Sequence, residues 1–158
     1  HPFVDLLRHW ARIDDDAEDA AAAEKLEAAV RRLLADDADD VFPFLATLMG
    51  MRPGGRHAAR IEGLEGEAME EMIFRSVRRV LERLAAERPL LLVFEDLHWA
   101  DLSSVKLLEA LLRLVTDHPL LLVCVGRPDF PDTLGRLTSA ARAEHHDRYL
   151  ELVLAPSP

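Results

Sequence analysis

The sequence predicts an α/β fold, a three-layer sandwich with a parallel sheet, whose first third is helical. Two observations carry this prediction. Residues 1–88 place apolar side chains three and four positions apart, which is typical of amphipathic helices. Residues 89–158 instead alternate short apolar runs with helical stripes, and strands joined by helical crossovers form parallel sheets. With 158 residues, of which 49% are hydrophobic, the chain is the size of one domain with a real core.

The part from residue 1 to 88 is predicted to be mainly helical. Two acidic clusters, around residues 14–19 and 36–40, interrupt the apolar pattern and separate the helices. A Pro-Gly-Gly loop follows at 53–55, and Pro89 stops the last helix. The predicted helices cover residues 3–13, 17–35, 41–49 after Pro43, and 65–87.

The part from residue 89 to 158 is predicted to alternate strands and helices. Leu90–Phe94 and Leu120–Val125 are continuous apolar runs, which is how strands buried on both faces look. Between them, Ser103 or Ser104 can cap a helix that ends before Pro119. A loop and a helix follow at about 130–143, and Tyr149–Leu154 is predicted to be a third strand.

Composition and charge exclude several classes of function. There are 19 Lys and Arg against 29 Asp and Glu, for a formal charge of −10, which argues against nucleic-acid or anionic-membrane binding by this segment. Cys124 is the single cysteine, so the chain can form no internal disulfide. No apolar stretch is long enough to span a bilayer. We therefore expect a cytoplasmic segment, and the start at His-Pro-Phe suggests a piece of a longer protein.

Ligands of parallel sheets bind beyond the carboxyl ends of the strands, here residues 95–101, 126–129 and 155–157. In this region Glu95 and Asp96 directly follow the first apolar strand, which is the Walker B arrangement. A carboxylate at a strand tip can hold Mg²⁺ through its water shell, while its neighbour orients the attacking water. Taken alone, the pattern more often marks a strand that ends in solvated acids.

The longer string PLLLVFEDLHWAD, Pro89–Asp101, closely resembles the Walker B segment of the STAND branch of AAA-related ATPases. These modules occur beside bacterial adenylate or guanylate cyclase domains and in LuxR-type regulators. Leu120–Asp129 resembles the family's next strand, whose tip carries a sensor arginine ahead of a proline. Weaker similarities lie at Tyr149–Pro156, like the strand before the helical lid, and at Pro2–Leu7, like the helix after the second strand.

The resemblance implies that residues 1–158 are one partial P-loop nucleotide-binding domain, whose parent binds ATP and Mg²⁺. It makes Glu95 and Asp96 the catalytic acids and the water-mediated Mg²⁺ site, and it places Arg127 and Asp101 at the nucleotide. The order of the two acids is reversed relative to the family, so which acid holds the metal and which orients the water stays open. Arg127 could instead pair with Asp129 or Asp101, and Asp101 could simply cap a helix.

The sequence has no Gly-x-x-x-x-Gly-Lys-[Ser/Thr] loop to cradle phosphates. The family places this loop upstream of the position of His1, so we expect this segment alone to be inactive and its parent to be a slow ATPase. Other polar groups are expected to be structural: His98 and Trp99 should pack, residues 36–40 should be a solvated helix end, and His145-His146 should lie on the surface. The four methionines should belong to the core.

We expect a role in the ATP-binding switch of a multidomain bacterial signalling or regulatory protein. Its partners would be the nucleotide, other domains of the same chain and a second copy that meets an uncovered sheet edge or face. One alternative is an interaction module that works without nucleotide, in which the site is degenerate and the helical first third docks a partner. Another is a small-molecule enzyme that uses Glu95 and Asp96 as acid and base.

Overall fold

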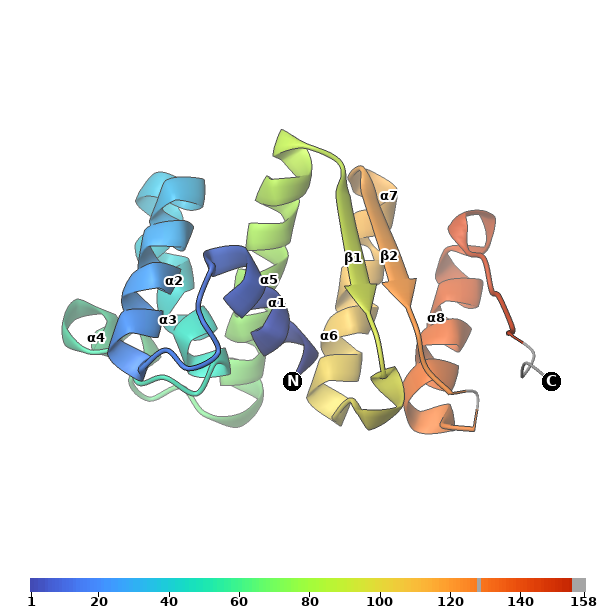
Figure 1. Ribbon diagram of the computed structural model, residues 1–158, viewed down its shortest axis with the longest axis horizontal. Coiled ribbons are helices and arrows are strands. Elements are labelled where there is room, and N and C mark those ends of the chain that lie inside the picture. Colours follow the sequence, from blue (N-terminus) through green and yellow to red (C-terminus); the bar gives the residue numbers. More distant parts are fainter. Residues whose placement is uncertain (128, 155–158) are drawn as a thin grey trace.

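The computed structural model describes residues 1–127 and 129–154, and within them the chain is mostly helical with a small parallel sheet (Figure 1). None of the helices is long and apolar enough to cross a membrane. The helices are α1 (Pro2–Ala11), α2 (Asp19–Leu34), α3 (Ala38–Leu48), α4 (Ala58–Ile61), α5 (Gly66–Glu87), α6 (Leu102–Leu112), α7 (Leu114–Asp117) and α8 (Arg136–Glu144). The strands are β1 (Leu90–Phe94) and β2 (Leu120–Cys124), and the short turns are η1 (Ala35–Asp37), η2 (Gly55–His57), η3 (Leu97–Trp99), η4 (Pro131–Gly135) and η5 (His146–Arg148).

The predicted helices of the first part are present, with shifted ends. α5 matches its prediction to within one residue, because an uninterrupted apolar stripe defines it. α3 begins at Ala38, earlier than predicted, and contains Pro43 in its interior. Asp39 and Asp40 occupy its first turn, where negative charge is favourable. An acidic run can therefore open a helix as well as end one.

One core joins the helices to the sheet. Phe3 of α1 is fully buried, and its ring lies 5.1 Å from the ring of Phe94 at the end of β1. The buried side chains come from α1, α2, α3 and α5 in the first part and from both strands, α6 and α8 in the second. The largest fully buried side chains are Phe3, Leu26, Leu45, Leu97, Leu107, Leu108, Leu111, Val30, Val77, Val80, Val105 and Pro43.

The sheet consists of β1 and β2, which pair in parallel from Leu90 opposite Leu120 to Phe94 opposite Cys124. Alternate side chains point to opposite faces, so Leu92, Phe94 and Leu120 share the inner face, and all are buried. Figure 1 shows α6 and α7 behind the two strands. The strand–helix–strand unit is thus the predicted one.

The prediction that both strands are buried on both faces is wrong for the described chain. Leu91, Val93 and Leu121 lie on the outer face with 59%, 52% and 60% of their surface exposed. The physical reason is that the helices described here pack against the inner face only. The third layer of the predicted sandwich is therefore not seen in residues 1–127 and 129–154.

The predicted third strand at Tyr149–Leu154 is also wrong, since the described sheet has two strands. Leu150 and Leu152 are 78% and 76% exposed. Glu151 of this segment pairs with Arg142 of α8, and Arg148 of η5, just before the segment, donates its guanidinium to carbonyls of α7, including that of Val115 at 3.1 Å. The segment is thus tied to α8, and the residue before it to α7.

The acidic segment 36–40 is not simply solvated, contrary to the sequence-based expectation. Asp37 pairs with Arg79, and Asp40 pairs with Arg60. Asp39 accepts a hydrogen bond from Arg31 at 2.9 Å. Of the four methionines, Met51 is buried, whereas Met49, Met69 and Met72 are partly exposed, so the expectation of core methionines holds fully for one.

Candidate functional site at the strand ends

Two backbone hydrogen bonds bring the ends of the two strands together. The Val125 amide donates to the Phe94 carbonyl at 2.8 Å, and the Leu97 amide donates to the Val125 carbonyl at 3.0 Å. Glu95 and Asp96 lie between these bonds, directly after β1, and both are exposed. The predicted site acids therefore stand at the carboxyl end of a parallel strand, as the sequence indicated.

The backbone of Asp96 adopts a left-handed conformation, with φ 54° and ψ 32°. This region costs most L-residues about 1–2 kcal/mol, but Asp and Asn adopt it more readily because their short side chains can bond locally. The Asp96 carbonyl accepts a hydrogen bond from the Trp99 amide at 2.9 Å, which closes the turn η3. The left-handed backbone of this turn therefore favours Asp or Asn at position 96.

Both carboxylates are free to bind water or metal. In the described part of the chain, neither Glu95 nor Asp96 makes a side-chain hydrogen bond or ion pair. Exposed, unpaired carboxylates fit a Mg²⁺ ion that keeps several of its waters. The donor set at the strand end is therefore suitable for the metal part of a magnesium-nucleotide site.

His98 and Trp99, the last two residues of η3, differ in how far they are buried. His98 is 7% exposed, and its ring lies 5.2 Å from the ring of Phe130, which confirms the expected packing. Its Nδ1 atom is buried without a hydrogen-bond partner among the described residues. Trp99 is 77% exposed, so the expectation that it packs is wrong. Trp99 contacts the edge of this cluster, with ring centroids 5.1 Å from His98 and 6.3 Å from Phe130.

Asp101 caps helix α6. Its Oδ1 accepts the Ser104 amide at 2.8 Å, and its Oδ2 accepts the Ser104 hydroxyl at 2.9 Å. His1 Nε2 lies 3.6 Å from the same Oδ2. The expected capping by Ser103 or Ser104 is therefore wrong, and Asp101 fills the structural role that the sequence left open. Its contact with nucleotide stays a prediction.

Arg127 follows the tip of β2 and is exposed. It forms no ion pair with Asp101 or Asp129, the two structural partners suggested by the sequence. The preceding Gly126 lies close to the Walker B turn, since a Cβ atom there would come within 3.5 Å of the His98 amide. Pro128, the next residue of the predicted sensor segment, lies outside the described residues. So do residues 155–157, the third predicted ligand loop.

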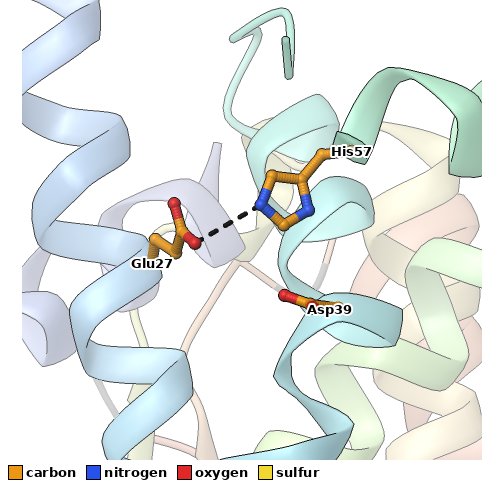
Figure 2. Close-up of side chains that lie close together, drawn as sticks. All are labelled: Glu27, Asp39 and His57. Carbon is orange, nitrogen blue, oxygen red and sulfur yellow. Dashed lines mark hydrogen bonds and ion pairs between the residues drawn. The ribbon is translucent and has the colours of Figure 1, made fainter. Parts of the chain in front are cut away.

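Sequence reasoning missed a second polar cluster, formed by Glu27 of α2, Asp39 of α3 and His57 of η2 (Figure 2). Their ligand atoms all lie within 4.8 Å of one another, and His57 Nε2 lies 3.3 Å from Glu27 Oε1. The spacing of Glu27 and Arg31 by four residues was a readable signal. The approach of His57 and Asp39 to Glu27 depends on how α2, α3 and η2 pack. No local sequence pattern predicts it.

Two arginines already neutralise this cluster. Arg31 donates to both Glu27 and Asp39 at 2.9 Å, and Arg56 lies 3.1 Å from Glu27 and 3.4 Å from Asp39. The hydrogen bond from Arg31, followed by the contacts with His57 and Arg56, holds the pKa of Glu27 below its usual value. A metal would have to displace both guanidinium groups, so the arrangement is that of an ion-pair network.

A parallel strand followed directly by two adjacent acids is the arrangement of the Walker B segment in α/β nucleotide-binding domains. The chain belongs to the AAA ATPase domain family, whose model matches residues 2–123. This family has a P-loop α/β fold and in general uses ATP and Mg²⁺. The acids at the strand end fit the metal, whereas the 158 residues contain no phosphate-binding glycine loop.

One relative is an uncharacterised protein of Rhizobium meliloti (strain 1021), which is 32% identical over 92 residues. The match covers 58% of this chain and 8% of the relative. The chain therefore spans a small part of that protein's length. No solved structure gives a significant match.

Proposed function

We propose that residues 1–158 are part of the ATP-binding switch domain of a multidomain bacterial signalling or regulatory protein. The observation that carries the proposal is the pair of exposed, unpaired acids Glu95 and Asp96 at the end of a parallel strand, in a member of the AAA ATPase domain family. The resemblance to the STAND branch favours a cyclase-associated or transcriptional regulator. In the parent, binding or slow hydrolysis of ATP would shift the balance between two conformations.

The two acids would divide the work of metal binding and water activation. One carboxylate would hold water molecules of the Mg²⁺ shell, and the other would accept a proton from, or orient, the attacking water. The Asp96 turn is tied to the tip of β2 by the Leu97–Val125 hydrogen bond, so both acids have a fixed backbone position. Mg²⁺ would supply charge stabilisation at the phosphates.

Arg127 would sense the terminal phosphate. Its guanidinium is exposed and free of ion pairs with the described acids, and a planar guanidinium suits bidentate phosphate contacts. In the parent, Arg127→Ala should therefore leave ADP affinity nearly unchanged and weaken ATP binding to the same level. Equal losses for ADP and ATP would make Arg127 a structural residue.

The test of the proposal is a pair of calorimetric titrations with Mg-ATP. The chain 1–158 should bind no tighter than roughly millimolar, because it lacks the main phosphate-binding element. The parent protein should bind in the micromolar range through a phosphate loop outside these residues. A parent that does not bind ATP would overturn the proposal, and micromolar binding by residues 1–158 would show that they hold phosphates in another way.

A second candidate function is a nucleotide-independent interaction module, and one observation favours it. The outer sheet face exposes Leu91, Val93 and Leu121, a patch that soluble proteins usually cover. Either other domains of the same chain or a second copy would cover it. Sedimentation of residues 1–158 at high concentration distinguishes these, because self-association through the patch should weaken in a Leu91→Ser, Leu121→Ser double variant.

A further inference from the structure

A groove opens between the first turns of α5, the start of α6 and the end of α3. Its volume is about 620 Å³, which is within the roughly 300–1,000 Å³ of typical ligand pockets. It lies near the same end of the molecule as the strand tips, where α6 begins (Figure 1). Its floor is apolar and consists of Leu48, Met69, Ile73, Phe74 and Leu107.

The ionisable side chains that line the groove, here called its rim, are three glutamates and His1. Glu65 and Glu67 line the groove, are exposed and form no ion pair in the part of the chain that the structure describes. Glu70 also lines it and accepts hydrogen bonds from Ser103 at 2.7 Å and from Lys106 at 3.3 Å. These contacts, that of Ser103 first, hold the pKa of Glu70 below its usual value. The rim is thus anionic at neutral pH, with two carboxylates left unpaired.

We propose that this groove is the docking site of a basic amphipathic helix from a protein partner. The apolar stripe of such a helix would lie on Met69, Ile73 and Phe74, and lysine or arginine side chains beside the stripe would meet Glu65 and Glu67. Apolar floors with a charged rim bind amphipathic helices in this way, and opposite charge across the rim selects the partner. An acidic helix would be repelled by the same two carboxylates.

The groove is separate from the proposed nucleotide site, but one helix links them. Ser103 and Ser104 of α6 line the groove, and α6 is capped by Asp101, five residues after Asp96. This inference goes beyond the proposed function and does not depend on ATP. It can therefore be tested on residues 1–158 alone, and its failure would leave the nucleotide proposal untouched.

The experiment is a fluorescence-anisotropy titration of residues 1–158 with a labelled Leu/Lys amphipathic peptide of about 16 residues, long enough to form a helix. A Leu/Glu peptide of the same length is the control ligand. We expect saturable binding of the Leu/Lys peptide and binding at least about tenfold weaker for the Leu/Glu peptide. Equal affinity for both peptides, or no binding of the Leu/Lys peptide, would overturn the proposal.

Matched variants locate the binding site. Glu65→Lys with Glu67→Lys should weaken binding at least about tenfold, whereas Glu87→Lys with Asp117→Lys makes the same change in net charge away from the groove and should change it less than about twofold. Both control residues are exposed, and they are the last residues of α5 and α7. Figure 1 shows that α5 ends at the opposite end of the molecule from its first turns. Equal weakening by both pairs would show general charge attraction, and no weakening by either would move the site elsewhere; each result contradicts the proposal.

A third variant separates the apolar floor from the rim. Met69→Glu adds negative charge, so a purely electrostatic site would bind the basic peptide more tightly, but loss of the apolar contact should weaken binding at least about tenfold. Met69 is partly exposed, and unchanged circular dichroism at the titration temperature establishes that the variant is folded. Tighter binding by a folded Met69→Glu variant would refute docking on the floor.

Discussion

The packed helices α2 and α3 differ from the sheet in how their acidic and apolar side chains are partnered. In the helical part, acidic side chains such as Asp14, Glu27 and Asp37 pair with lysine or arginine. In the sheet part, Glu95 and Asp96 are unpaired in the described chain. The same contrast holds for apolar groups, because the helices bury their stripes whereas the strands leave one face open.

This difference concerns how much each part says about function. Surface ion pairs contribute little stability each, so the helical network says little about which part of that surface is functional. The exposed leucines and valines on the outer face of the sheet, in contrast, lack the burial that usually stabilises a parallel sheet. The open face is formed by β1 and β2, and the free acids directly follow β1, so the proposed nucleotide site and the uncovered apolar surface adjoin the same sheet.

The largest expected effect concerns the acids. In the parent protein, Asp96→Asn should lower ATP hydrolysis by roughly 10²–10⁴-fold with nearly unchanged nucleotide affinity, if Asp96 orients the water. Asn also tolerates the left-handed backbone of Asp96, so the variant removes charge without straining the turn. Glu95→Gln should instead weaken Mg²⁺-dependent binding. Unaffected turnover in both variants would remove the Walker B assignment.

The next prediction compares a covered leucine with an uncovered one. Leu108 of α6 is fully buried, so Leu108→Ala should lower the free energy of unfolding by about 2–5 kcal/mol. Leu121 of β2 is 60% exposed, and Leu121→Ala should cost less than about 1 kcal/mol. Urea denaturation at low protein concentration measures both. Equal losses would mean that the outer sheet face is covered in solution.

A smaller effect is expected for the alkylation rate of a thiol on the inner face of β2 compared with one on its outer face. Burial raises the pKa of Cys124 from 9.0 to about 11, so the reactive thiolate should be roughly a hundredfold scarcer than in the unfolded chain. Alkylation at pH 8 should therefore be slow in the native protein and fast in denaturant. A Cys124→Ser, Leu121→Cys variant moves the thiol to the outer face and should react at nearly the unfolded rate. Slow reaction there would contradict an open face.

Local patterns predicted the helices, both strands and the position of the acids, because each depends on residues near one another in sequence. The apolar stripe of α5 and the run before Glu95 are signals of this kind. The third strand failed because an apolar extended segment becomes a strand only beside a partner, and Glu151 in this segment instead pairs with Arg142 of α8. Continuous apolar runs likewise specify strands that can be buried on both faces, without specifying what covers them.

At the site, the sequence predicted which residues stand at the strand ends but could not predict their surroundings. The cap formed by Asp101 was one of two readable alternatives, and the structure selects it over the serines. The left-handed backbone of Asp96 and the exposure of Trp99 depend on how η3 lies against Val125 and Phe130. The cluster of Glu27, Asp39 and His57 needs three elements to meet, and no local pattern encodes that meeting.

The smallest expected effect tests whether the helical network contributes to stability at all. Glu27 has a pKa lowered from its usual value near 4.5, first by the hydrogen bond from Arg31, so its stabilising contribution is present above about pH 4.5 and is lost as the pH falls through the lowered folded-state pKa. Glu27→Gln should therefore reduce the free energy of unfolding by about 0.5–1 kcal/mol at pH 7, a modest value for a partly exposed pair.

The loss caused by Glu27→Gln should shrink towards zero as the pH falls through the lowered folded-state pKa, because the carboxylate of the unmodified protein is then also becoming protonated. Glu24→Gln on the same helix is the matched control, because Glu24 is exposed and has no ion pair in the described chain, and it should change stability by less than about 0.3 kcal/mol at every pH. Urea denaturation between pH 3 and 7 measures both variants. A loss in Glu27→Gln that does not depend on pH would assign the effect to packing, and the contrast between a charge-paired helical part and a sheet with free acids would then rest on the sheet alone.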